Sequence, residues 1–526
     1  MQYDFWNNPL VVSAMRLKYR RSSPGITTCL YLLVLLTIGA TLHHYQEAYN
    51  MPPGRAFLLA ILGLQFLVSG GIALFTVANS MNAEVTNRTL DFQRIVSLRP
   101  YEILLGKMLG EPAISYFLAL ATLPFAVICW LEGSVTVVTM IWFYINLATF
   151  TLLCAAIGTI HTLVLSTNTT GMRRNNNGSV GLAFIWVPMM IFPTLLTRGT
   201  GWLQDSWLGA IINLCTPIGS LRFLFKGQPW DAQITLWGYT FPSLVVAPLM
   251  QLVLAYWIVM AMSRRLKNPI DPPVRRLHTY AALIIFDLLL AGVCFTQWQQ
   301  GMATGRLLAQ FGLSHLIASL VLLIGITPVK QVLVSWLWRF QTREPWLRSS
   351  CLGSRSEITL VLPIYCLLGA VIVFVGFALP TNFTRTPVNA AVRYDSLLEV
   401  MAVTSTLILA LGMLHQGCVA IAGRSGLLIY AACLLLINIL PPIVASLLLY
   451  PQSLRTAQGL LSIVVSLSPG AYYLSHLTRF TLQPLPCEWL IATQIGMLIG
   501  CFWMLRRWLN NQQAVVATKL ASMEVL

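Results

Sequence analysis

Charged residues that could do chemistry are scarce in this chain, and one group of them, between residues 80 and 107, has a pattern of its own. Lysine, arginine, aspartate and glutamate make up 10% of the 526 residues. Within this segment Thr89 can cap a short helix that Pro100 would end. Charges of both signs on such a helix set the register of a protein contact. The charged and polar residues of this segment that could take part in such a contact are Glu84, Arg88, Thr89, Asp91, Arg94 and Arg99.

One acidic residue lies inside an apolar stretch. Asp287 is flanked by Leu283–Phe286 and Leu288–Leu290. An ionised side chain in hydrocarbon is costly unless it is paired or hydrated, so such a residue marks a functional position by default. Asp287 could instead be structural, because it lies near the inner end of its stretch and could be hydrated there or pair with Arg275 or Arg276. Both interpretations stay open.

The sequence lacks the motifs of known nucleotide, metal and catalytic sites. A phosphate-binding loop needs Gly-x-x-x-x-Gly-Lys-Ser/Thr, but Tyr101 stands where Gly106-Lys107 would require the first glycine. His43 and His44 have no further ligands at metal-binding spacing. The eleven cysteines form no Cys-x-x-Cys pair. We therefore expect no catalytic residue, no metal and no cofactor in this chain, and no enzyme activity of its own.

The elements that must position these residues are apolar stretches long enough to cross a bilayer, which takes about 20 residues. Because 57% of the residues are hydrophobic, a soluble domain of this length could not hide its apolar surface. We expect an all-α polytopic membrane protein with about twelve spans. The expected spans are 26–44, 56–79, 108–131, 136–165, 179–197, 238–262, 280–298, 307–329, 358–379, 396–420, 427–450 and 487–505.

The spans fall into two sets of six, in residues 1–267 and 268–526, that repeat at an offset of about 252 residues. The starts of the first, second and sixth spans agree with this offset, whereas those of the third to fifth agree less well. Pro217 and Pro469 lie in similar phrases one period apart. Because six is an even number, duplication predicts two tandem six-helix bundles of the same orientation, related by a pseudo-two-fold axis along the membrane normal.

The net charge of +16 could suggest nucleic-acid binding, but the positions of the basic residues explain it differently. With both termini in the cytoplasm, 24 of the 33 lysines and arginines fall in cytoplasmic segments. This positive-inside bias predicts the orientation and argues against nucleic acid as a partner. Residues 8–21 have the spacing of an amphipathic surface helix. Its basic side would lie on lipid phosphates, or the helix would be a simple juxtamembrane anchor.

The segment between the second and third spans resembles the permeases of the ABC type-2 exporter family. That family has an acidic residue at the inner end of span 2, then a Gly/Arg-Thr-Leu-Glu/Asp phrase, Leu-x-Pro, and Glu-Ile-Leu-x-Gly-Lys leading into span 3. The matching residues here are Glu84, Arg88–Asp91, Leu98–Pro100 and Glu102–Lys107. The resemblance covers this segment directly, and the six-span plan extends it across each half.

The resemblance implies that residues around Arg88 to Arg94 form a coupling helix that docks on separate ATPase subunits. Two copies of that subunit would bind ATP and Mg, and this chain would be the permease of an exporter in a bacterial inner membrane. By analogy, the substrate pathway runs between spans 2 and 5 and spans 8 and 11. Residues that could line it are Gln65, Ser69, Gly70 and Asp287.

The second half departs from the family pattern. Its corresponding cytoplasmic segment, 330–357, is basic and rich in tryptophan but has no Arg-Thr-Leu-Asp phrase. It retains the composition of a partner-docking or headgroup-level segment. We expect two unequal ATPase contacts, with Arg339, Arg343 and Arg348 as a possible second coupling segment.

The main alternative is a secondary transporter of twelve spans driven by an ion gradient. That class places acids at mid-membrane in several spans, and this sequence has the one candidate Asp287. A membrane enzyme acting on lipids would need a cluster of catalytic polar residues at one interface, which the sequence does not show. No residue pattern in the sequence indicates which compound would be transported.

Overall fold

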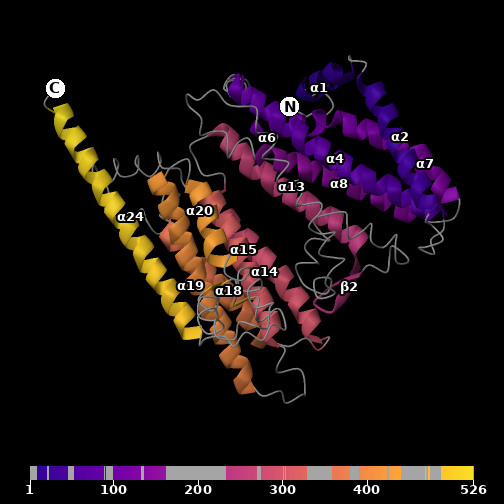
Figure 1. Ribbon diagram of the computed structural model, residues 1–526. Coiled ribbons are helices and arrows are strands. Elements are labelled where there is room, and N and C mark those ends of the chain that lie inside the picture. Colours follow the sequence, from indigo (N-terminus) through magenta and orange to yellow (C-terminus); the bar gives the residue numbers. More distant parts are fainter. Residues whose placement is uncertain are drawn as a thin grey trace, which may run out of the picture. The chain divides into compact units, whose positions relative to one another are not determined.

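The computed structural model is built almost entirely from helices, with one two-stranded hairpin among the residues it describes (Figure 1). The chain forms two compact units that divide after Pro269, and the hairpin turn Leu236–Gly238 belongs to the second unit. The structure describes residues 9–19, 23–44, 53–87, 89–90, 99–131, 136–160, 233–268, 274–299, 301, 304–327, 358–378, 390–422, 426–439, 468–469, 472–473 and 487–524.

The first unit is a bundle centred on the long helix Pro53–Thr86. Its elements are α1 (Pro9–Tyr19), α2 (Ser23–His44), α4 (Pro53–Thr86), α6 (Pro100–Gly110), α7 (Ala113–Leu131), α8 (Val137–Ile160), β1 (Gln233–Leu236), β2 (Tyr239–Pro242) and α13 (Ser243–Lys267). α4 contacts α2, α7 and α8, while α7 also contacts α2 and α8. α13 packs on α8 and α6.

Close packing between α4 and α8 depends on a glycine. A Cβ at Gly158 of α8 would lie 2.7 Å from Leu74 O and 3.3 Å from Ala78 N, both backbone atoms of α4. The rings of Phe66 and Phe150 meet edge to face across the same two helices, with centroids 6.1 Å apart. Small residues allow two membrane helices to approach closely enough for dispersion contacts along their length.

A helix, α1, is present within the segment 8–21, where a surface helix was expected. Its Val11 is 3% exposed. α1 packs on α6, where a Cβ at Gly110 would lie 2.9 Å from Ala14 Cβ and 3.2 Å from Val11 Cα. One side of this helix therefore contacts protein.

Two expected spans begin later than the sequence suggested. The third, expected at 108–131, is interrupted at Pro112, which cannot donate a backbone hydrogen bond, so α6 ends and α7 starts anew. The sixth, expected from residue 238, is preceded by the β1–β2 hairpin. Trp237 and Gly238 have φ angles of 55° and 82°, the conformation of a two-residue hairpin turn. The helix α13 then begins at Ser243.

The second unit is a bundle in which the long helix Ala390–Ala422 contacts most of the others. Its elements are α14 (Arg276–Gln299), α15 (Thr304–Ile326), α18 (Ile358–Ala378), α19 (Ala390–Ala422), α20 (Gly426–Leu434), the π-helix η7 (Leu435–Ile439) and α24 (Cys487–Glu524). α19 contacts α15, α18, α20 and α24. α14, α15 and α18 contact one another.

The helix contacts of the two units follow one scheme. Among α2, α4, α7, α8 and α13 of the first unit, the contacting pairs are α2 with α4 and α7, α4 with α7 and α8, and α8 with α7 and α13. In the second unit they are α14 with α15 and α18, α15 with α18 and α19, and α19 with α18 and α24. Replacing α2, α4, α7, α8 and α13 by α14, α15, α18, α19 and α24 converts the first set into the second.

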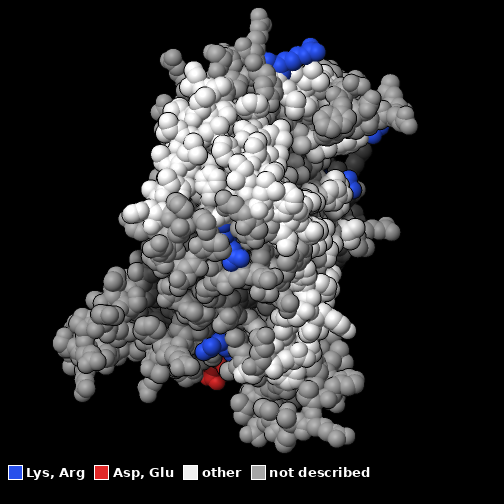
Figure 2. Space-filling view, turned by 90° about the vertical axis from the view of Figure 1, so that its right-hand side faces the viewer, with Lys and Arg blue, Asp and Glu red and all other residues white. Residues whose placement is uncertain are grey.

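The helices have the length and surface of membrane spans. Eight of them in the described part of the chain, namely α4, α7, α8, α13, α14, α15, α19 and α24, are long and apolar enough to cross a bilayer. Large apolar side chains such as Leu120 and Leu131 of α7 are more than half exposed. Described charged residues are few on the face in Figure 2. Such a surface needs lipid as its solvent, which confirms the expected all-α, multi-pass membrane protein.

Several sequence predictions fall on residues outside those described. They are the fifth span at 179–197, the part of the eleventh span beyond Ile439, the segment 330–357 and most of the coupling helix. These expectations stay predictions.

The contact at Gly158 generates a test of the fold. We expect Gly158→Ala to lower the free energy of unfolding by about 1–3 kcal/mol, because the added methyl group overlaps backbone atoms that cannot move aside alone. Gly63→Ala in α4 is the matched control, since nothing lies within 4 Å of its Cβ position. Unfolding of the purified chain in detergent measures both, and equal stabilities would contradict the close contact.

Candidate functional site

The polar segment of the first unit starts at the end of α4 and leads into α6. After α4, Thr89 Oγ1 donates to Glu84 O at 3.3 Å. At the far end Arg99 is the N-cap of α6, and its backbone N–H donates to Glu102 Oε2 at 3.0 Å, with Pro100 in the first turn. A capping acid and a proline at this position favour helix initiation. The sequence therefore defines where α6 begins.

A largely buried ion pair joins α6 to α4. Lys107 Nζ lies 2.6 Å from Glu84 Oε1 and donates to Ser80 Oγ at 3.1 Å. Ser80 Oγ donates in turn to Glu111 Oε1 at 2.7 Å. The side chain of Lys107 is 5% exposed and that of Glu84 is 20% exposed, so their attraction is only weakly screened by water. We call Ser80, Glu84, Lys107 and Glu111 the α4–α6 ion cluster.

The α4–α6 ion cluster connects the two ends of the polar segment, because it joins Lys107 of α6 to Glu84 of α4. α6 also packs on α1, α8 and α13, and Leu90 is buried in the core that these helices share with α4. A displacement applied to the segment between Glu84 and Lys107 would therefore reach α4 through the ion pair. The arrangement can transmit a movement.

The structure describes three of the six proposed coupling residues. Glu84 belongs to the α4–α6 ion cluster, Thr89 is exposed beside it, and Arg99 is exposed at the start of α6. Arg99 donates to Tyr101 Oη at 3.0 Å, and this bond, with the nearby charge of Glu102, raises the pKa of the guanidinium, which stays protonated. The other proposed coupling residues lie outside the described part of the chain: Arg88, Asp91, Arg94, Arg339, Arg343 and Arg348.

The sequence analysis did not identify Ser80, Lys107 and Glu111 as site residues. Ser80 and Glu84 are separated by one helical turn, as are Lys107 and Glu111. Residues at this spacing lie on one face of a helix. These two polar pairs lie at the facing ends of neighbouring spans, and this feature of the sequence could have predicted their contact.

Three of the proposed pathway residues lie buried in α4. Gln65 is fully buried, and its Nε2 donates to Thr122 Oγ1 and, at 3.5 Å, to Ala119 O of α7. Ser69 and Gly70 are buried about one turn further along. The amide of Gln65 thus holds α4 against α7, and a role of these residues in transport stays a prediction.

The fourth pathway candidate, Asp287, has a partner that the sequence analysis did not consider. It is fully buried in α14, and its Oδ2 lies 2.8 Å from His315 Nδ1 on α15. The other ring nitrogen, Nε2, lies 3.2 Å from Tyr365 O of α18. His315, rather than Arg275 or Arg276, is therefore the partner of Asp287. A polar residue inside the apolar stretch 304–326 was the signal for it.

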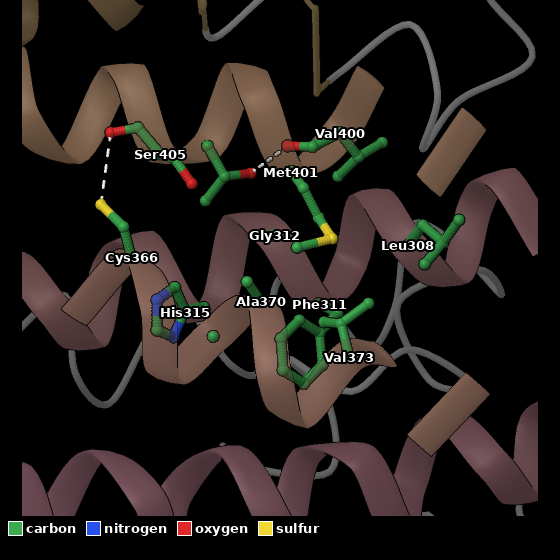
Figure 3. A pocket seen from close by; sticks show the side chains of 12 residues that line it. Leu308, Phe311, Gly312, His315, Cys366, Ala370, Val373, Val400, Met401 and Ser405 are labelled. Carbon is green, nitrogen blue, oxygen red and sulfur yellow. Dashed lines mark hydrogen bonds between the residues drawn. The ribbon is translucent and has the colours of Figure 1, made fainter. Parts of the chain in front are cut away.

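A small pocket with a cavity volume of about 20 Å³ lies beside His315, between α15, α18 and α19. Figure 3 shows His315, Cys366 and Ser405 toward one end of the pocket and Leu308 and Val373 toward the other. Cys366 Sγ donates to Ser405 O at 3.5 Å. Its lining is mainly apolar, and a cavity of this volume has room for about one water molecule.

Comparison of the chain with models of protein families, with curated proteins and with solved structures found no match. The function therefore has to be inferred from the residues and their contacts. The described residues contain no group of three or more histidine, cysteine, aspartate or glutamate side chains placed to hold a metal ion.

The α4–α6 ion cluster generates a stability test. We expect Lys107→Met to cost about 1–3 kcal/mol of unfolding free energy, because it leaves the largely buried Glu84 carboxylate without its counter-charge. Glu84→Gln in the same chain should recover part of this loss. A double-mutant cycle measured by unfolding in detergent gives the coupling energy, which we expect at about 0.5–3 kcal/mol.

The matched control for this cycle is Arg99→Met, which removes an exposed charge from the same helix and should change stability by no more than about 0.5 kcal/mol. Additive effects of the Lys107 and Glu84 substitutions would mean that the two side chains do not interact.

Proposed function

We propose that this chain is the transmembrane permease of an ATP-driven ABC exporter and that it couples to separate ATPase subunits. The α4–α6 ion cluster is the observation that most supports the proposal. Glu84 and Lys107 stand at the two ends of the segment that resembles the family, and they contact each other. The residues that carry the resemblance therefore have a physical role, because their ion pair connects the polar segment to a membrane helix.

An ATPase can act on membrane helices only through a shared contact whose free energy differs between two states. In this proposal the ATPase subunits bind ATP and Mg, and their movement displaces the residues between Glu84 and Lys107. The ion pair passes that displacement from α6 to α4. This chain supplies the pathway and the coupling contact, and catalysis of hydrolysis belongs to the partner.

The two units are, in this proposal, repeats of one six-span plan. The recurrence of the same helix contacts in both units supports this view, and so does the offset seen in the sequence. The distribution of basic residues supports both termini in the cytoplasm, and a transporter split into permease and ATPase subunits favours a bacterial inner membrane. The departure of 330–357 from the family pattern favours unequal docking of two ATPase subunits.

Charge reversal in the coupling segment tests the proposal. We expect Arg88→Glu together with Asp91→Arg to weaken co-purification of the ATPase at least tenfold, because complementary charges determine the register of such a contact. ATP hydrolysis by the reconstituted complex should lose its stimulation by transported compounds. A screen of lipophilic compounds for that stimulation also searches for the substrate.

The matched control is Glu488→Lys, an exposed charge reversal at the start of α24, which lies on the outer side by the charge rule. It should leave ATPase association unchanged. Unchanged association in the Arg88 and Asp91 variant as well would contradict the coupling assignment.

A second candidate function is a secondary transporter driven by an ion gradient, and the buried Asp287–His315 pair is the observation that favours it. Purified chain alone in liposomes distinguishes the two candidates. Under the exporter proposal, a pH gradient without ATPase drives no uptake of lipophilic fluorescent compounds. Uptake abolished by a protonophore would support the second candidate and contradict the first.

A further inference from the structure

The imidazole of His315 lies between two hydrogen-bond acceptors. Nε2 is 3.2 Å from the backbone oxygen of Tyr365, and Nδ1 is 2.8 Å from Oδ2 of Asp287. A carbonyl oxygen can only accept, so the contact with Tyr365 requires a hydrogen on Nε2. The position of this one hydrogen determines how many protons the Asp287–His315 pair can hold.

With Nε2 protonated, two arrangements satisfy the contact at Nδ1. Either Nδ1 also carries a hydrogen and donates to an ionised Asp287, or Nδ1 accepts a hydrogen bond from a protonated Asp287. The two arrangements differ only in the position of one proton, and in both the pair has no net charge. The remaining tautomer, with a bare Nε2, directs a lone pair at the Tyr365 oxygen and leaves a net negative charge.

A net negative charge would be poorly compensated at this depth. Asp287 is fully buried, His315 is 3% exposed, and Asp287 Oδ1 has no hydrogen-bond partner among the described residues. The nearest arginine along that face of α14 is Arg276, eleven residues or about 16 Å away. An unpaired charge in an apolar interior is strongly disfavoured, so the neutral, proton-bearing forms are favoured.

The other titratable groups on the helices around the pair do not replace that counter-charge. α14 places Tyr280 and Cys294 two turns either side of Asp287, and α18 contributes Tyr365 and Cys366. α19 contributes Thr404 and Ser405, which do not titrate, at the pocket wall. Glu399 of α19 is partly exposed, and Arg306 on α15 is nine residues before His315, about 13 Å along the helix.

Packing fixes the orientation of the ring. A Cβ at Gly369 of α18 would lie 2.5 Å from His315 Nε2, so the imidazole lies directly against that backbone. Phe311 is stacked with it, at 11° between ring planes and 6.2 Å between centroids. The ring therefore cannot exchange its two nitrogens by turning over without moving α18 or Phe311.

We propose that Asp287 and His315 form a proton-binding site that retains one dissociable proton in the wall of the α15–α18–α19 pocket. Because His315 lines that pocket, release of the proton would place a negative charge in the pocket wall. The inference concerns a proton held by the second unit and is independent of which energy source drives transport.

The decisive measurement is the tautomer of His315 in the full chain. The chain contains seven histidines, so selective ¹⁵N labelling of imidazole in lipid nanodiscs gives a tractable spectrum. At pH 8, where a histidine in water has lost its second proton, we expect His315 to retain the hydrogen on Nε2. A bare Nε2 with a hydrogen on Nδ1 would overturn the proposal. His315→Gln assigns the signal, and proximity to a ¹³C-labelled aspartate carboxyl assigns it if that variant does not fold.

A second measurement follows the proton through stability. Under the proposal the folded pair keeps one proton that the same side chains lose in water above pH 6.5, so raising the pH favours unfolding, by up to tenfold in the equilibrium constant for each pH unit. Asp287→Asn keeps a neutral hydrogen-bonding partner for Nδ1 and should remove this dependence. Identical pH dependence in the wild type and Asp287→Asn would refute the site.

Discussion

Hydrocarbon offers no hydrogen-bond partner, so buried polar side chains on these helices bond either to the backbone of their own helix, as Thr151 does to Leu147 O, or to a neighbouring helix. This constraint links the main observations. Gln251 of α13 bonds Asn146 and Thr149 of α8 at 3.0 and 2.6 Å. Gln65 and Asp287 have their partners on α7 and α15 in the same way. The polar residues therefore specify which helices are neighbours, while the apolar residues make contact with lipid and with one another.

The same constraint separates two kinds of charged contact. The Glu84–Lys107 pair retains access to water through Glu84, and it lies where a polar segment meets the bundle. Such a pair can hold and transmit a position. The Asp287–His315 pair has no such access, so its charge state is set by the proton that it holds. One contact is suited to coupling a partner protein, and the other to responding to protons.

Glycines determine how closely these contacts can form. Gly158 allows α8 to lie against the backbone of α4, Gly110 does so for α1 and α6, and Gly369 receives the ring of His315. At Gly312 a Cβ would lie 2.7 Å from Thr404 Oγ1, so α15 and α19 also approach closely. The positions of functional side chains thus depend on residues that have no side chain of their own.

The sequence by itself determined that this protein crosses a membrane many times, because hydrophobicity and length are local properties that add along the chain. It also located the polar segment and the acid Asp287. Only the tertiary structure decided that Lys107 pairs with Glu84 and that His315 pairs with Asp287. Those choices depend on which helices are adjacent and how each is rotated, and close packing between residues distant in sequence fixes both.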